Sequence, residues 1–336
     1  MLQVDPKLNE ILRATASGDQ RESAKAMQMF AKAVELPLRK GIMSCDILGN
    51  IFEAIQMAPG ACVRFPLDFL KPGTEKEFTA YTMPNCGFIP HCCVEGDYVE
   101  VPTYKIGNCI DWCLDYANDA RWDVVSRALE VLRAGHTKKM NDDGWHTLLA
   151  AGYDRNVMVV DSAAAQGQFT KRLVSMMKVV MRRNGGGNST CLNRGKLTDL
   201  YISPEAMEDI RNWNVDQVDE ITRREIFLGD DCDNGLTRIF CVNLHVLDEL
   251  GFGQEYQLFY ENQLAGGAGA GMPPNKIEIV VGLDLTNRDS FVMPVREELK
   301  VFEDPTLHRQ MRAGFYSWQR LGFAVLDSRR VLLGAI

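Results

Sequence analysis

Four residues in one short stretch have side chains that could hold a metal ion or provide a reactive thiol. Cys86, His91, Cys92 and Cys93 lie within residues 84–96. Zinc sites use thiolate and imidazole ligands at defined spacings, and adjacent cysteines rarely share one tetrahedral ion. Because this spacing matches no such ligand pattern, we expect no metal site. A thiol- or metal-dependent enzyme that uses Cys86, Cys92 and Cys93 remains an alternative interpretation.

The cysteine count gives an expectation about the remaining thiols. The chain has 336 residues and ten cysteines. Secreted disulfide scaffolds are short and cysteine-dense, whereas this chain is long. We therefore interpret the thiols as free and mostly buried.

Catalytic motifs with a known mechanism do not occur in the sequence. It has no Gly-x-Ser-x-Gly elbow, no His-Glu-x-x-His pair and no kinase signature. The glycine-rich residues 265–271 lack the Gly-Lys-Ser/Thr ending of a phosphate-binding loop, and the acidic residues 230–233 do not fit an EF-hand. We therefore expect no cofactor and no enzyme activity. The histidines are scattered without a common spacing: His91, His136, His146, His245 and His308.

Composition and charge indicate an ordinary globular protein. Hydrophobic residues make up 46% of the chain and charged residues 24%. The net charge of −8 argues against a dedicated nucleic-acid binder, although residues 178–183 form a local basic patch. No apolar run is long enough to span a bilayer, so we expect no membrane partner.

The central element of the predicted fold is a helix within residues 119–152. Asp119 can cap it, and apolar residues recur behind the cap at three- and four-residue steps. Gly135 and Gly144 interrupt this pattern, each at a cost of about 1 kcal/mol relative to alanine. The pattern therefore predicts either one long kinked helix or two shorter ones. Its apolar face comprises Trp122, Val125, Ala128, Leu129, Leu132, Met140, Trp145, Leu148 and Leu149.

Two helices are predicted before this central helix. Asp19 and Glu22 resemble a capping box, and the helix that they open ends before Pro37. Four-residue steps of apolar side chains over residues 43–55 predict a second short helix, which ends at residues 59–60.

Residues 62–106 predict a long two-stranded hairpin with an elaborate tip. Strand patterns at 78–83 and 98–106 flank the tip at 84–96, which is rich in proline and glycine. Because two strands alone are only marginally stable in water, we expect this arm to rest on another subunit or element. The apolar side chains of the tip are Phe88, Ile89 and Val94.

Residues 157–336 predict a mixed α/β region with a strand-rich end. An amphipathic helix over 169–183 ends with Arg182 and Arg183, which the helix dipole favours there. The tripeptide Ser203-Pro204-Glu205 predicts the start of another helix. Strands are predicted at residues 157–160, 200–202, 225–228, 236–247, 277–285, 291–302, 311–318 and 321–326.

The order of these elements resembles the major capsid proteins of tailed double-stranded DNA phages, which have the Hong Kong 97-type fold. The hairpin Phe78–Ile106 runs through Asp111-Trp-Cys-Leu into the helix from Trp122, as that family's extended loop runs into its spine helix. The segment Leu200-Tyr-Ile-Ser-Pro-Glu-Ala-Met is similar to the strand-to-helix turn of its axial domain.

The C-terminal part carries the third similarity. Val295-Arg-Glu-Glu-Leu, the following long strand and Arg320-Leu-Gly-Phe-Ala-Val-Leu-Asp are similar to the strands that close the family's peripheral and axial domains. The resemblance covers nearly the whole chain from Asp19, and it implies an α+β fold of four parts. These are an N-terminal arm (1–61), a strand and extended loop (62–106), a peripheral domain with the spine helix (107–156 and 286–320), and an axial domain (157–285 and 321–336).

The resemblance also implies partners and a location. The chain would self-assemble into pentamers and hexamers of an icosahedral shell that encloses double-stranded DNA without sequence-specific binding. Because the first helix opens near Asp19, with no scaffolding segment before the arm, assembly would use a separate scaffolding protein or none. A portal and a cement protein are further implied partners, and the shell would assemble in the bacterial host cytoplasm and become the virion capsid. Expected intersubunit contacts are Phe88, Ile89, Cys92, Cys93, Val94 and Arg133.

A second shell protein is an alternative within the same fold. An encapsulin-like nanocompartment shares the Hong Kong 97-type fold but packages an enzyme in place of a genome. The long hairpin insert and the N-terminal arm favour the phage interpretation.

Overall fold

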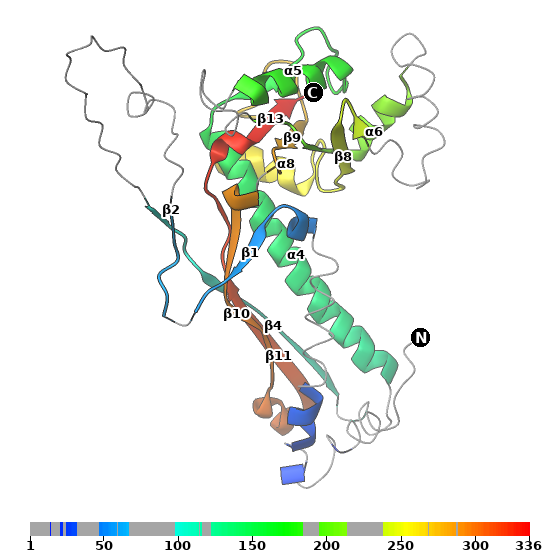
Figure 1. Ribbon diagram of the computed structural model, residues 1–336. Helices are drawn as coiled ribbons and strands as arrows, with labels where there is room; N and C mark the ends of the chain where they lie inside the picture. The colour runs from blue at the N-terminus through cyan, green and yellow to red at the C-terminus, as the bar shows by residue number, and fades with distance from the viewer. Residues whose placement is uncertain are drawn as a thin grey trace, which may run out of the picture. The chain divides into compact units, whose positions relative to one another are not determined.

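The computed structural model combines helices and β-sheets in two compact units (Figure 1). Unit 1 takes its residues from 1–64, 100–144 and 292–324, and unit 2 from 65–99, 145–291 and 325–336. This mixture confirms the expected α+β class. The residues that the structure describes are 14, 21–22, 25–31, 47–58, 60–66, 98–113, 115, 122–183, 195–213, 238–267, 269–286 and 288–336.

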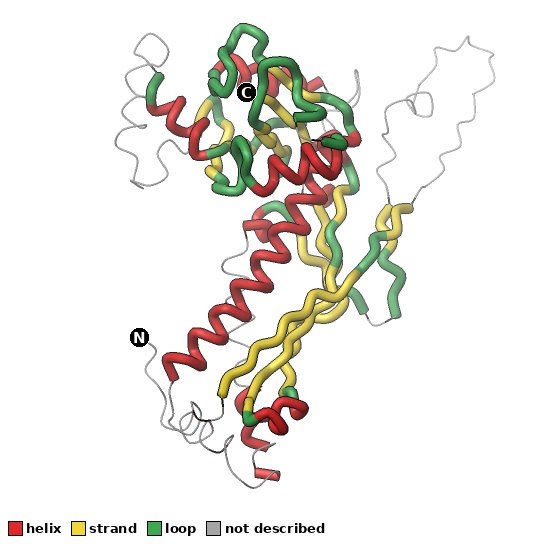
Figure 2. Tube along the Cα trace, turned by 180° about the vertical axis from the view of Figure 1, so that it is seen from behind, coloured by secondary structure: helices red, strands yellow, loops and turns green. Residues whose placement is uncertain are grey.

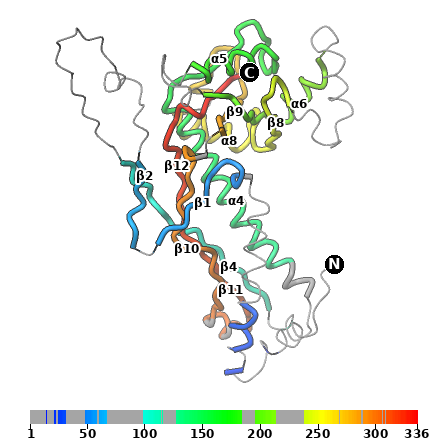
Figure 3. Tube along the Cα trace, viewed as in Figure 1, coloured from blue at the N-terminus to red at the C-terminus, as the bar shows by residue number. Residues whose placement is uncertain are grey.

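Long antiparallel strands dominate the sheet of unit 1. Its strand order is β1 (Glu53–Gln56), β10 (Phe291–Glu303), β11 (Arg312–Leu321) and β4 (Tyr104–Cys113), and β12 (Ala324–Val325) also pairs with β10 (Figure 3). β11 pairs antiparallel with β10 and, along its whole length, with β4, whereas β1 pairs with β10 in parallel. Alternating burial along β11, from exposed Tyr316 to buried Ser317, shows that the helix side of this sheet forms the core.

The predicted central helix is one continuous helix, α4 (Trp122–Asp154), of 33 residues. It runs beside the long strands of unit 1 (Figure 2). Leu132, His136 and Met140 recur at four-residue steps on its buried side, as the apolar pattern predicts. The two helix-breaking glycines have packing roles instead. A Cβ atom on Gly135 would lie 2.7 Å from Asn108 Nδ2, and one on Gly144 would overlap the side chain of Leu48.

The helix predicted over residues 43–55 is wrong. Residues Ile47–Asn50 form a short 3-10 helix, η1, and residues Glu53–Gln56 form strand β1. Isoleucine at four-residue steps fits a helix, but its β-branched side chain also suits a strand, and pairing with β10 decides the outcome. The preceding helix is confirmed where the structure describes it, because residues 25–31 are helical with Met27 and Phe30 buried.

The predicted hairpin arm is described only at its base. Strand β2 (Arg64–Pro66) pairs with β3 (Tyr98–Glu100), and the strand predicted over 98–106 is broken at residues 101–103 before β4. β4 continues to Cys113, further than the alternation indicated. The tip of the arm, residues 84–96, lies outside the described residues.

Unit 2 is built on a six-stranded mixed sheet with a fully buried centre. Helices α5 (Lys171–Arg183) and α6 (Pro204–Arg211) pack on it around Leu173, Met177, Leu200, Ile210 and Leu332. The strand order is β5 (Met158–Val160), β13 (Val331–Ala335), β9 (Ile279–Leu283), β6 (Asp199–Ile202), β8 (Val242–Val246) and β7 (Arg238–Ile239).

Several details of unit 2 sharpen or correct the sequence interpretation. Ser203 caps α6 as predicted, because its Oγ accepts a hydrogen bond from Ala206 N at 3.1 Å. The strand predicted over 236–247 is instead the hairpin β7–β8. Helix α8 (Glu255–Phe259), the π-helical turn η4 (Tyr260–Leu264) and strand β13 were not predicted. In the described part of the chain, no helix combines the length and apolarity needed to cross a membrane.

The remaining short elements lie in connections. They are the 3-10 helices η5 (Arg288–Ser290), η6 (Pro305–Gln310) and η7 (Ser328–Arg330). The side chain of Asp327 begins η7 by accepting a hydrogen bond from Arg329 N, which places the chain for β13.

Candidate assembly surfaces

Most residues expected at subunit contacts lie outside the described residues. These are Phe88, Ile89, Cys92, Cys93 and Val94, together with Cys86 of the alternative thiol site. Arg133 is described: it lies on α4, next to the fully buried Leu132, and is half-buried. The role of these residues at a subunit boundary stays a prediction.

No constellation typical of an active site forms among the residues that are described. No group of three His, Cys, Asp or Glu side chains there could hold a metal ion. The described cysteines are free thiols, but the prediction that they are mostly buried is wrong: Cys62, Cys109 and Cys241 are exposed and Cys113 is half-buried. His245 Nε2 lies 2.9 Å from Asp199 Oδ1, and Asn243 donates to the same oxygen. Burial would raise the pKa of Asp199, but hydrogen bonds from His245, Thr198 and Asn243 hold that pKa below its usual value. This cluster is a stabilised carboxylate on the sheet.

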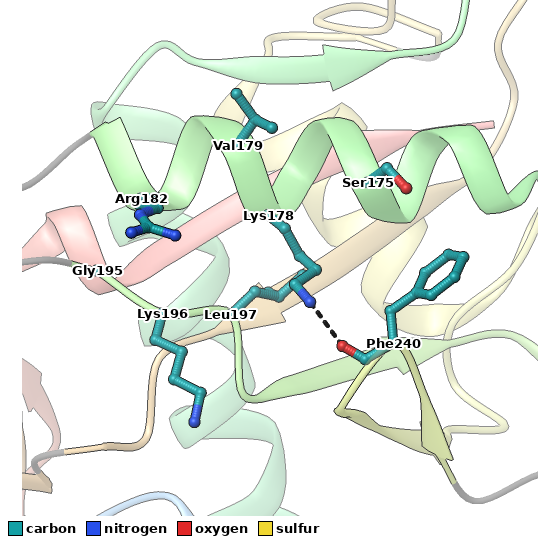
Figure 4. Close-up of a pocket in the computed structure, with 8 residues that line it drawn as sticks. All are labelled: Ser175, Lys178, Val179, Arg182, Gly195, Lys196, Leu197 and Phe240. Carbon is teal, nitrogen blue, oxygen red and sulfur yellow. Dashed lines mark hydrogen bonds between the residues drawn. The ribbon is translucent and has the colours of Figure 1, made fainter.

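Unit 2 has an open groove of about 700 Å³ beside α5 (Figure 4). One wall is formed by α5, with Ser175, Lys178, Val179 and Arg182. The opposite wall is formed by residues 195–197 and Phe240. Val179 and Phe240 are each about half exposed, so the groove combines apolar surface with positive charge.

Phe240 is held in the groove by an unusual turn. Phe240 and Cys241 join β7 to β8 and have φ values of 47° and 63°. A two-residue hairpin turn with positive φ at both positions is normally built from Asn-Gly, because larger side chains cost about 1–3 kcal/mol there. Lys178 Nζ donates a 2.6 Å hydrogen bond to Phe240 O, which fixes the turn against α5. The phenyl ring is therefore presented to solvent by a rigid backbone.

The charges that line the groove all have one sign. Lys178, Arg182 and Lys196 contribute three cations, and none of the described residues that line it is acidic. Within the described part of the chain, neither Arg182 nor Lys196 forms an ion pair. The described lining of the groove suits an apolar group that carries negative charge beside it.

A second exposed surface of unit 2 is the loop of residues 248–255, here called the acidic loop. It contains Asp248, Glu249 and Glu255, and no lysine or arginine. Phe252 stands at its centre with 67% of its surface exposed, the highest value among the large hydrophobic side chains of unit 2 that are described.

The backbone of the acidic loop is fixed by hydrogen bonds. Gln254 N donates to Gly251 O and Tyr256 N donates to Glu249 O, each at 3.1 Å. The backbone N–H of Phe252 donates to the buried carboxyl of Glu278, which also accepts a 2.8 Å hydrogen bond from Ser203 Oγ. Burial raises the pKa of Glu278, and these hydrogen bonds oppose the rise. An exposed aromatic side chain is thus held on a rigid loop.

The sheet of unit 1 exposes a third surface, of aromatic and basic residues. Phe302 stacks on Tyr316 with ring centroids 5.4 Å apart and lies 6.2 Å from Trp318. Lys105 and Lys300 place their ammonium groups 4.4 and 5.3 Å from the centroid of the Trp318 ring. These cation–π contacts cover part of the tryptophan, so the surface is partly satisfied within unit 1.

The sequence indicated the basic residues on one wall of the groove, but it did not indicate that they line a groove. Residues 178–183 stood out as a basic patch, but the helix dipole explained their charge. Phe240 could not be identified, because no turn signature precedes it and the partner wall comes from residues far away in the chain. Phe252 lies between two glycines in a sequence typical of an ordinary loop.

Comparison with solved structures identifies the fold. The chain is similar to a chain of the Cyanophage Pam1 capsid asymmetric unit, with a TM-score of 0.58 and 14% identity over 89% of this chain and 92% of that chain. A chain of Microbacterium phage Oxtober96 gives 0.55 and 10% over 87% and 90%, and one of the mature capsid of bacteriophage PhiM1 gives 0.50 and 10% over 86% of each chain. No protein-family model and no curated protein matches the sequence. The similarity to these structures shows that the chain has the fold of phage capsid proteins.

Proposed function

We propose that this protein is the major capsid protein of a tailed phage, which self-assembles into pentamers and hexamers of an icosahedral shell around double-stranded DNA. The observation that carries the proposal is the match to the Pam1 capsid chain, which covers about nine-tenths of both chains. Such coverage means that the similarity includes nearly every element of both chains, beyond a single shared motif.

The parts of the chain have matching roles in this proposal. We assign residues 107–156 and 286–320 to the peripheral domain, supported by the sheet of long strands beside α4. We assign residues 157–285 and 321–336 to the axial domain, supported by the six-stranded sheet with α5 and α6. Residues 1–61 are the N-terminal arm, and residues 62–106 are the strand and extended loop, whose tip contacts neighbouring subunits.

The proposed partners follow from this role. The chief partner is the chain itself, and a portal, a cement protein and a separate scaffolding protein complete the particle. The net charge of −8 suits a container from which DNA must be released, because a strongly basic lining would retain the genome. Assembly would take place in the bacterial cytoplasm, and the mature site is the virion.

Expression of the chain in a bacterium, followed by size-exclusion chromatography and negative-stain microscopy, tests this proposal. We expect uniform closed shells or tubes in the void fraction. A folded monomer that forms no shells or tubes over a wide range of protein and salt concentrations would contradict it.

The contents of native particles separate the two kinds of shell. Double-stranded DNA that survives nuclease treatment inside the particles supports the phage capsid. An enclosed enzyme with a docking peptide, in particles without DNA, would support the encapsulin-like alternative.

A further inference from the structure

We propose that the acidic loop of one copy inserts Phe252 into the basic groove of the next copy, and that this contact builds the rings of the shell. The inference rests on the proposed function, because it names the contact that joins neighbouring subunits. It follows from three features of unit 2: the groove, the loop and their separation along β8.

The groove combines apolar and positively charged side chains in its lining. Val179 and Phe240 line it with exposed apolar surface, and Lys178, Arg182 and Lys196 line it with positive charge. A volume of about 700 Å³ is enough for one aromatic side chain with its flanking residues. Pockets of this kind accept the aromatic anchors that dominate binding energy at protein interfaces.

The acidic loop has the complementary chemistry. Its exposed aromatic ring lies between acidic residues in the sequence, of which Asp248 is exposed and Glu249 is half-buried, so the loop carries the charge opposite to that of the groove. The hydrogen bonds of the Phe252 and Tyr256 backbone N–H groups fix the loop before binding, so little conformational entropy is lost on contact. Both surfaces are thus preformed.

The two surfaces cannot meet within one copy. The turn at Phe240 precedes β8, and the acidic loop follows the other end of that strand. Five residues of extended chain span about 17 Å. The loop cannot swing across this distance, because Phe252 N–H is bonded to Glu278 and Gly251 packs against Glu205.

Complementary surfaces at different places on one subunit produce head-to-tail association. Such a heterologous contact closes into a ring when the rotation between subunits divides a full turn. The contact therefore joins neighbouring subunits head to tail around a ring, and the same residues form it in pentamers and in hexamers.

Variants that disable one surface each test the contact. The loop variant is Phe252→Asp, and the groove variant combines Arg182→Glu with Lys196→Glu. All three side chains are exposed, so we expect unchanged circular dichroism and thermal unfolding. Loss of a central aromatic anchor in the loop variant weakens association by about 30-fold or more. In the groove variant, like charges face each other across the contact and oppose association. Neither variant should therefore form rings or closed shells at concentrations where the wild type does.

The matched control exchanges the charges within one chain. Adding Asp248→Lys and Glu249→Lys to the groove variant restores opposite charges across the contact, and we expect shells to return. Phe252→Ser provides a second loop variant with no added charge, should the aspartate disturb the loop. Mixing the loop variant with the groove variant leaves one intact loop and one intact groove, so we expect a 1:1 complex by native mass spectrometry.

The outcomes separate this inference from the proposed function. Wild-type shells together with normal shells from both variants would overturn the inference alone. Groove-variant shells that are normal but empty of nuclease-protected DNA would assign the groove to nucleic acid and also overturn it. A wild type that never assembles would overturn both proposals.

Discussion

The two sheets of this protein are stabilised in different ways. In unit 2 every residue of β6, β9 and β13 is buried, so both faces of the sheet centre are covered within the unit. In unit 1 the strands alternate: Phe315 is fully buried, whereas Tyr316 beside it on β11 is 39% exposed. One sheet is the interior of a layered α/β unit, and the other is a single layer covered on one face.

This difference shows where substitutions should matter. In unit 2 the aromatic residues interlock, as Trp145 does with Tyr201 and Tyr256 at centroid distances of 4.8 and 5.8 Å. In unit 1 Phe315 packs against Phe30 and Trp112, with ring centroids 5.5 Å apart in each case. Close approach to α4 in this unit depends on two glycines, Gly135 and Gly144. Large-to-small changes should be most costly in unit 2, and small-to-large changes should be most informative in unit 1.

The largest expected effect is that of Trp145→Ala in unit 2. Trp145 is fully buried, so its removal should leave a cavity and cost about 3–5 kcal/mol of unfolding free energy. Urea denaturation measures this loss. Trp145→Phe should cost clearly less, because Trp145 Nε1 has no hydrogen-bond partner to lose among the described residues. Equal losses for both variants would contradict the cavity explanation.

Leu132→Ala tests the contribution of a buried core side chain in unit 1. The side chain is fully buried on α4, so we expect a loss of about 2–5 kcal/mol in the same measurement. Val131→Ala is the matched control, since Val131 is 55% exposed and should change stability by less than about 0.5 kcal/mol. A harmless Leu132→Ala would mean that the register of α4 is wrong.

Alanine substitutions of two glycines on α4 should change the free energy of unfolding by different amounts. Gly144→Ala meets the side chain of buried Leu48, so overpacking of about 1–3 kcal/mol should exceed the helix-propensity gain of about 1 kcal/mol. Gly135→Ala meets only the side-chain amide of half-buried Asn108, which can turn away. We therefore expect Gly135→Ala to be near neutral in thermal unfolding. If Gly144→Ala were more stable than the wild type, Leu48 would not need the space that the missing Cβ atom of Gly144 leaves.

The smallest expected effect is the dependence of stability on pH, which should fall in different pH ranges for the two units. His136 of unit 1 is buried with Nε2 2.7 Å from Ser317 Oγ, and burial lowers its pKa. Because the unfolded histidine binds a proton at about pH 6.5, stability should fall as the pH drops through that value. Above that pH the residue should add nothing to the pH dependence of stability.

Two carboxyls of unit 2, those of Asp161 and Asp199, should affect stability in a lower pH range. Burial would raise the pKa of Asp161 and Asp199, but hydrogen bonds outweigh it and both pKa values are lowered. Their contribution should be lost only as the pH falls through about 4. Urea midpoints at pH 7.5 and 5.5 test the separation, and His136→Gln should flatten the difference. An unchanged slope in that variant would assign the effect to other groups.

The sequence was sufficient to predict an element where its pattern fitted one structure only. Ser203-Pro204-Glu205 predicted the start of α6, and the strands predicted at 291–302 and 311–318 correspond to β10 and β11. It failed where a pattern had two solutions, as for Ile47, Ile51 and Ile55, which tertiary pairing places in a 3-10 turn and a strand. Strand β13, Val331–Ala335, was missed because a strand buried on both faces shows no alternation.

The assembly surfaces were harder to predict for a related reason. The groove joins Arg182, Lys196 and Phe240, which the fold brings together from separate elements. The left-handed turn at Phe240 contradicts local preference, so only tertiary structure reveals it. Exposure of Phe252 is likewise a property of the folded loop, since its sequence is that of an ordinary glycine-rich turn.

A cryo-electron microscopy reconstruction of particles from the expressed chain tests the account most directly. It should show closed shells with rings of five and six copies of unit 2, in which Phe252 of each copy contacts Val179 or Phe240 of the next. Rings that leave Phe252 in solvent would contradict the proposed contact. A chain that forms neither shells nor tubes would contradict the capsid function itself.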